Sequence, residues 1–121
     1  NVFIDLKNGQ KRFVSLEGAF ADDNAPKRIV MFNSRIHLVA DYVRARSLSD
    51  TRIVGFDFLG RNVAALKDGT VQTLIAQHSD RQVASAVLSL VDKFIMGTDV
   101  HKKDRYTQMD ILNRYNCDYY M

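Results

Sequence analysis

The stretch Arg52–Gln77, RIVGFDFLGRNVAALKDGTVQTLIAQ, decides the fold of this chain. It holds two apolar runs with strand character, Arg52–Phe56 and Thr73–Ala76, and between them a short segment with a polar face. One polar residue follows each run: Asp57 follows the first and Gln77 the second. In a parallel sheet, residues just past the carboxyl ends of the strands line the crevice in which ligands bind. The pattern therefore predicts two polar side chains at the ligand-binding edge of a sheet.

A third run of the same kind lies upstream, where the apolar segment Arg28–Phe32 is followed by Asn33. The next segment, Ser34–Arg46, is amphipathic, and one helical face carries its apolar residues Ile36, Val39, Ala40 and Val43. A short helix is expected around Asn62–Lys67, with Gly69 as a left-handed residue after its end. Because strands alternate with helices, the sequence predicts an α/β fold with a mostly parallel sheet flanked by helices.

The longest predicted helix covers Asp80–Met96, with Ser79 or Asp80 as its N-terminal cap and Gly97 after its end. A stripe of apolar residues predicts that this helix packs on the sheet; the stripe consists of Val83, Ala86, Val87, Leu90, Val91 and Phe94. Met109–Leu112 is expected to form one more strand. Aromatic residues of the tail are expected to cover its surface: Tyr115, Tyr119 and Tyr120.

The amino-terminal part of the chain is expected to contain a strand, a turn, a helix and a loop. In chain order these are Asn1–Leu6, Lys7–Gln10, Phe13–Phe20 and Asp22–Lys27. Within the helix, Phe13, Leu16 and Phe20 share one face. The start at Asn1, rather than at methionine, leads us to expect further residues upstream.

Composition indicates one globular domain, since 121 residues with 46% hydrophobic content are enough for a core. The net charge is +3, but the basic residues are scattered. Their one dense cluster, His101–Arg105, is interrupted by Asp104 and is typical of a solvated loop rather than a nucleic-acid footprint. No apolar run approaches the roughly 18–20 residues that span a bilayer, and no signal-peptide pattern opens the chain. We therefore expect no contact with a membrane.

The three polar residues after the apolar runs are candidates for ligand binding. The Asp57 carboxylate can accept hydrogen bonds from two neighbouring hydroxyls, and Phe58 beside it offers an apolar wall to a sugar ring. Asn33 has a donor and an acceptor on one amide, but Asn33 or Ser34 is also well placed to cap the following helix, and for Asn33 alone the capping role is favoured. Gln77 is either a loop amide or a residue that selects the ligand, and Asp57 is either a ligand contact or a brace for its loop. Together they favour a neutral, hydroxyl-rich ligand.

Patterns for other kinds of chemistry are missing from the sequence. The histidines His37, His78 and His101 do not have metal-ligand spacing, so we expect no metal and no cofactor. Cys117 is the single cysteine and has no nearby histidine, which excludes an intrachain disulfide and gives no catalytic pair. A phosphoacceptor receiver domain is excluded because Asp5 stands without an acidic neighbour near the first strand. We therefore expect no enzymatic activity.

Several segments together carry a family resemblance. The series Asn33-Ser34-Arg35, Val54-Gly55-Phe56-Asp57, Leu66-Lys67-Asp68-Gly69 and Leu74-Ile75-Ala76-Gln77 resembles the effector-binding part of LacI/GalR-type transcriptional regulators. Type I periplasmic sugar-binding proteins have the same core. The tail Met109–Asn116 with Asp118-Tyr119-Tyr120 is also similar to the end of such regulators. The resemblance covers residues 28–121. One departure follows Gln77, where Ser79 and Val83 stand at positions that the family usually fills with proline and glycine.

The resemblance implies a periplasmic-binding-protein type I-like domain of two lobes that close on a small effector, usually a sugar. Residues 1–121 would form its C-terminal lobe, and Asn33, Asp57, Gln77 and, less directly, Phe58 would contact the ligand. It further implies a cytoplasmic repressor that is a homodimer at full length and binds operator DNA through a missing N-terminal headpiece. The alternative within the same fold is a periplasmic sugar-binding protein that serves a transporter or a membrane sensor.

Overall fold

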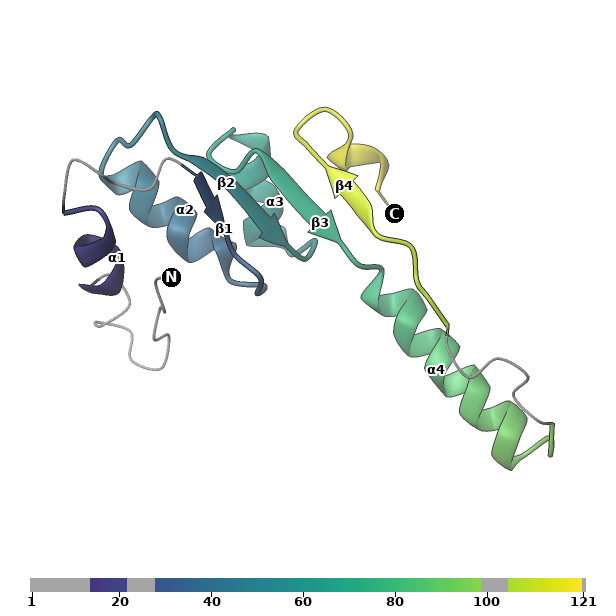
Figure 1. The fold of residues 1–121 in the computed structure, drawn as a ribbon. Coiled ribbons are helices and arrows are strands. Elements are labelled where there is room, and N and C mark those ends of the chain that lie inside the picture. Colours follow the sequence, from purple (N-terminus) through teal and green to yellow (C-terminus); the bar gives the residue numbers. More distant parts are fainter. Residues whose placement is uncertain (1–13, 22–27, 99–104, 121) are drawn as a thin grey trace.

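The computed structural model describes residues 14–21, 28–98 and 105–120. Its sheet has four strands in the order β1-β2-β3-β4, namely β1 (Arg28–Val30), β2 (Arg52–Phe56), β3 (Thr73–Ala76) and β4 (Asp110–Leu112). The first three strands are parallel, and β4 pairs with β3 in the antiparallel direction. Figure 1 shows this open sheet with the helices beside it. The predicted α/β class with a mostly parallel sheet is confirmed.

The helices alternate with the strands as predicted. They are α1 (Val14–Ala19), α2 (Ile36–Ala45), α3 (Gly60–Lys67) and α4 (Ser79–Phe94), and a 3-10 turn, η1 (Cys117–Tyr119), follows β4. Gly69 has the expected left-handed conformation after α3, with φ 84°. The predicted strand Asn1–Leu6, the turn Lys7–Gln10, the loop Asp22–Lys27 and residues 101–104 of the basic cluster lie outside the described residues.

The core lies between one face of the sheet and helices α2 and α3, which Figure 1 shows side by side behind the strands. All four predicted apolar positions of α2 are buried: Ile36, Val39, Ala40 and Val43. From the sheet, Ile53 and Leu74 point into the same core. Gly55 allows the close approach of α2, because a Cβ atom at this position would lie 2.8 Å from Cβ of Ile36. The sheet is thus tightly packed against α2 and α3.

The longest helix, α4, contradicts the predicted packing on the sheet. None of its residues is buried, and Figure 1 shows it running away from the strands after β3. Leu90 is 56% exposed and Phe94 is 73% exposed. The predicted cap is also wrong, because His78 occupies the cap position and neither Ser79 nor Asp80 does. Helical periodicity correctly predicted that α4 has an apolar face, but it does not tell which surface covers that face.

Candidate functional site

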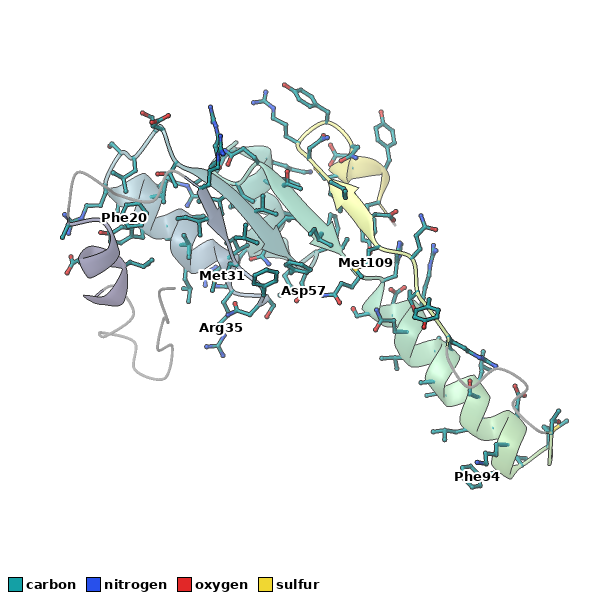
Figure 2. The ribbon with its side chains drawn as sticks, viewed as in Figure 1. Phe20, Met31, Arg35, Asp57, Phe94 and Met109 are labelled. Atoms are coloured by element: carbon teal, nitrogen blue, oxygen red, sulfur yellow. The ribbon has the colours of Figure 1, made fainter. Side chains whose placement is uncertain are left out.

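The predicted polar pair meets at the carboxyl edge of the sheet. Strands β2 and β3 are neighbours with Phe56 opposite Ile75, so the residues that follow them leave the sheet side by side. Nε2 of Gln77 donates a hydrogen bond to Oδ1 of Asp57 at 3.1 Å. Figure 2 places Asp57 at this end of the strands, close to the point where α4 departs. One carboxylate and one amide therefore converge on a shared point.

A hollow of about 490 Å³ opens beside this pair. Three of the four residues predicted to contact a ligand line it: Asp57, Gln77 and Phe58. The remaining lining residues are Ser34, Leu59, His78, Ser79, Asp80 and Tyr120. Phe58 is half-buried, and its ring packs on that of Tyr120 with centroids 4.6 Å apart. The hollow offers hydroxyl, amide and carboxylate groups above an aromatic floor.

Asn33, the fourth predicted residue, does not line the hollow. Strand β1 ends at Val30 rather than at Phe32, so Asn33 does not directly follow the strand as Asp57 and Gln77 do. Its Oδ1 accepts a hydrogen bond of 2.9 Å from the backbone N–H of Arg35, at the start of α2. The role of Asn33 as a ligand contact stays a prediction. Its neighbour Phe32 is 82% exposed at the same edge.

The backbone at this edge adopts an unusual conformation at two residues. Asp57 has φ 70° and His78 has φ 49°, both in the left-handed region. For residues other than glycine, such backbone conformations cost on the order of 1–3 kcal/mol each and persist only where the surroundings impose them. The two residues thus mark the places where the chain turns out of β2 and β3 into the hollow.

Asn62 is a site residue that the sequence analysis missed. It is fully buried in α3, and its side-chain amide reaches the loops that follow β1 and β2. Nδ2 donates to the carbonyl oxygens of Ser34, Phe56 and Asp57 at 2.9, 3.2 and 3.1 Å. A buried asparagine inside a short helix has no periodic signal, so no pattern in the sequence pointed to it.

His78 is a second residue with an unexpected role. It is 6% exposed, and its Nε2 lies 2.7 Å from Oδ2 of Asp110. Its backbone N–H donates to the hydroxyl of Tyr120 at 3.2 Å, and the two rings lie 4.7 Å apart. These contacts join the start of α4 to strand β4 and to the residues after it. His78 and Tyr120, which both line the hollow, are therefore held together.

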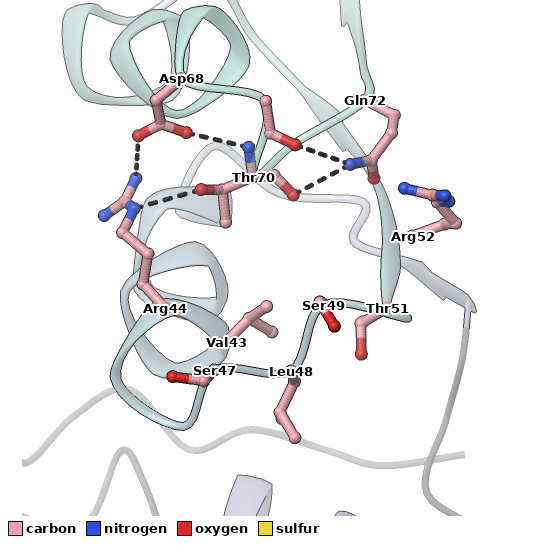
Figure 3. A pocket seen from close by; sticks show the side chains of 11 residues that line it. Val43, Arg44, Ser47, Leu48, Ser49, Thr51, Arg52, Asp68, Thr70 and Gln72 are labelled. Atoms are coloured by element: carbon pink, nitrogen blue, oxygen red, sulfur yellow. Dashed lines mark hydrogen bonds and ion pairs between the residues drawn. The ribbon is translucent and has the colours of Figure 1, made fainter.

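A second hollow, of about 340 Å³, lies at the amino edge of the sheet and is shown in Figure 3. Arg44 crosses its rim, bonding to Oδ2 of Asp68 at 2.7 Å and to the hydroxyl of Thr70 at 3.1 Å. Nε2 of Gln72 donates to the carbonyl oxygens of Gly69 and Thr70. Four polar side chains of this hollow, those of Arg44, Asp68, Thr70 and Gln72, are thus bonded to one another or to neighbouring backbone.

The pKa of the Asp68 carboxyl is lowered by its surroundings. Partial burial opposes ionisation, but hydrogen bonds from the hydroxyl and amide of Thr70 and the charge of Arg44 outweigh that effect. Asp68 is thereby held as the anion that binds Arg44 across the rim. The amino edge is accordingly a structural ion-pair network.

Within residues 14–21, 28–98 and 105–120, no group of three or more histidine, cysteine or acidic residues is placed to hold a metal ion. In the same part of the chain, no helix has the length and apolar character needed to cross a membrane. Cys117 is buried in the core. At the carboxyl edge, the polar side chains that line the hollow can donate and accept hydrogen bonds.

Comparison with solved structures identifies similar proteins. A proposed LacI transcriptional regulator from Bacteroides fragilis has a TM-score of 0.87 and 32% sequence identity over 96% of this chain. A glucose-galactose binding protein from Geobacillus stearothermophilus has a TM-score of 0.74 with 19% identity over 82% of the chain. A Caulobacter myo-inositol binding protein has a TM-score of 0.71 with 21% identity over 88% of it.

This chain spans 40% of the length of the regulator and 35% of the length of each sugar-binding protein. No protein-family model matches the sequence, and no curated protein is significantly similar to it. The predicted resemblance to LacI-type effector domains is confirmed by the structural likeness. The chain has the periplasmic-binding-protein type I-like fold of these structural neighbours.

Proposed function

We propose that this chain is the ligand-sensing part of a LacI-type transcriptional regulator and binds a small, sugar-like effector. The observation that carries the ligand class is the Asp57–Gln77 pair beside the hollow at the carboxyl edge. A carboxylate accepts hydrogen bonds from adjacent hydroxyls, and an amide both donates and accepts. Within the described residues, no lysine or arginine lines this hollow, which disfavours phosphorylated ligands. We propose binding without a chemical step, and thus no enzymatic activity.

The regulator role is supported by the likeness to the Bacteroides fragilis protein, because its 32% identity exceeds the 17–24% of the other similar structures. In this proposal the chain forms one lobe, and a second lobe supplies the opposite wall of the site. The uncovered apolar face of α4 supports the need for such a partner surface. Closure around the effector then shifts the affinity of a cytoplasmic homodimer for operator DNA.

A periplasmic sugar-binding protein is the second candidate. It is favoured by neighbours described as transporter solute-binding proteins in complex with D-tagatopyranose or D-arabinose. The sequence upstream separates the two candidates, because a regulator needs a DNA-binding headpiece and a periplasmic protein needs a secretion signal.

Calorimetric titration tests the ligand class. The intact protein is titrated with D-arabinose, D-allose and myo-inositol, and the 121-residue chain is titrated in parallel. We expect the intact protein to bind at least one of these polyols and the 121-residue chain to bind it weakly or not at all, because it lacks the opposite wall. Micromolar binding by the 121-residue chain alone would contradict the proposal that this chain supplies only one wall of the ligand site. A lack of response of the intact protein to any polyol would contradict a sugar-like effector.

A further inference from the structure

The amide of Asn62 has its orientation fixed by three backbone carbonyls. The oxygens of Ser34, Phe56 and Asp57 can only accept hydrogen bonds, so the NH₂ group of Asn62 must face them. Its Oδ1 then faces His37, whose backbone N–H lies at 3.3 Å and whose Nδ1 lies at 3.1 Å. Because Oδ1 only accepts, Nδ1 of His37 must carry the proton. The neutral imidazole therefore has the Nδ1–H tautomer.

The same contacts join two helices and two loops. Helix α2 has no side-chain cap from Arg35, and the backbone N–H of His37 belongs to its first turn, which lacks intrahelical acceptors. Oδ1 of Asn62 fills that role from α3 across the space between the helices. Nδ2 meanwhile holds the loop after β1 at Ser34 and the loop after β2 at Phe56 and Asp57. One buried side chain thus sets the spacing of the two loops at the carboxyl edge.

Asp57 depends on this support because of its backbone conformation. With φ 70° it occupies a region that residues other than glycine rarely adopt. Besides the bond from Asn62 to its carbonyl, Asp57 is held by its N–H, which donates to the carbonyl of Ile75 at 3.0 Å. The bond to Ile75 fixes the end of the strand. The turn beyond it is closed by the N–H of Leu59, which donates to the Asp57 carbonyl at 3.0 Å, and the bond from Asn62 to the same carbonyl ties this turn to α3. The direction of the Asp57 carboxylate follows from that turn.

We infer that Asn62 is the positioning residue of the ligand-binding edge, holding Asp57 in its left-handed turn and so aiming the carboxylate at the ligand. The effect of Asn62 on ligand binding rests on the proposed function. Its effect on the backbone conformation of Asp57 does not depend on that function. Asn62 itself is fully buried and has no role in touching the ligand.

Three variants of the intact protein separate the two ends of the amide. Asn62→Asp keeps an oxygen for His37 and removes the donor to the three carbonyls, whereas Asn62→Leu removes both. Val71→Ala is the matched control, because Val71 is also buried but lies just before β3, away from the carboxyl edge. Backbone NMR shifts of Asp57, the ¹⁵N shifts of the His37 ring and the affinity for D-allose, D-arabinose and myo-inositol are measured for each.

In Asn62→Asp, we expect Asp57 to leave the left-handed region while His37 keeps its Nδ1–H tautomer. Polyol affinity falls by about tenfold or more, the loss expected when buried carbonyls lose their donor. In Asn62→Leu both sites change, and in Val71→Ala neither does. Unchanged Asp57 shifts in both Asn62 variants would overturn the inference. If the wild-type protein binds no polyol, the proposed function fails while the Asp57 shifts still decide the positioning role.

A second substitution covers the case in which Asn62→Asp does not fold. Glycine adopts positive φ at no steric cost, so Asp57→Gly removes the need for the support. Adding Asp57→Gly to Asn62→Asp should then restore folding, seen as a recovered cooperative thermal transition. If the double variant stays unfolded, Asn62 acts in some way other than by supporting Asp57, and the inference is wrong.

Discussion

The two hollows lie at opposite edges of one sheet and differ in how their polar groups are used. At the amino edge, Arg44, Asp68 and Thr70 bond to one another, and Gln72 bonds to neighbouring backbone. At the carboxyl edge, the side chains of Asp57 and Gln77 share one hydrogen bond, and neither side chain makes another hydrogen bond within the described residues. An ionised carboxylate has about four acceptor sites, so most of its capacity is unused. These unused acceptor sites of Asp57 are available to the hydroxyls of a ligand.

Backbone conformation points to the same difference. The carboxyl edge holds the left-handed residues Asp57 and His78, whose strain is typical of functional sites. The amino edge has Ser47, with φ 53°, where α2 gives way to the turn before β2. There the conformation only ends a helix. Strain at the carboxyl edge instead directs two side chains into one hollow.

The largest expected effect separates the two hollows by ligand affinity. Asp57→Asn keeps a residue that tolerates the left-handed region but removes the charge, and should weaken polyol binding about 30-fold or more, since a hydrogen bond to a charged group contributes about 2 kcal/mol. Arg52→Ala, in the amino-edge hollow, should leave the affinity within about twofold, because the side chain of Arg52 makes no hydrogen bond or ion pair within the described residues. If calorimetric titration shows equal losses of polyol affinity in both variants, the carboxyl-edge hollow is not distinguished from the amino-edge hollow as the ligand site.

A smaller effect concerns the core that supports the carboxyl edge. Gly55→Ala places a methyl group 2.8 Å from Cβ of Ile36, and the required shift of α2 should cost about 1–3 kcal/mol of unfolding free energy. Gly60→Ala is the matched control, because a Cβ atom at this first residue of α3 meets no atom within 4 Å. Chemical denaturation should show the control as stable as the wild type or slightly more so. A Gly55→Ala variant of wild-type stability would show that α2 is not packed as closely as described.

The smallest effect belongs to the amino edge. Arg44→Met removes exposed ion pairs and should cost about 0.5–1 kcal/mol, whereas Arg52→Met should cost less. The lowered pKa of Asp68 gives this contribution a pH dependence. The stabilisation is present above the pKa of the unfolded state and is lost as pH falls through the lower folded value. Denaturation at neutral and acidic pH should thus show the cost of Arg44→Met shrinking in acid, and a cost that grows in acid would contradict this pair.

The sequence predicted those parts of the fold that depend on residues close together in the chain, such as strand bounds and the buried face of a helix. Strands β2 and β3 have the predicted bounds, because each apolar run ends at a polar residue that leaves the sheet. The buried face of α2 was predicted because its apolar residues recur at helical spacing. The end of β1 was missed, since Met31 and Phe32 are apolar but lie beyond the strand.

The remaining misses concern long-range partners. The apolar stripe of α4 was recognised, but periodicity cannot name the surface that covers it, and no residue of α4 is buried. Asn62 was overlooked because its role depends on partners far away in sequence, at Ser34 and His37. The convergence of Asp57 and Gln77 was predictable, because adjacent parallel strands bring their carboxyl ends to one edge.

The most direct test is an NMR titration of the intact protein with D-allose, D-arabinose and myo-inositol. Backbone and side-chain amide shifts are followed at both edges of the sheet. We predict saturable changes at Asp57, at the side-chain amide of Gln77 and at Ser79, while Ser49, Thr70 and Gln72 stay unchanged. Changes confined to the amino edge, or no saturable change with any polyol, would contradict the assignment of the carboxyl edge as the effector site.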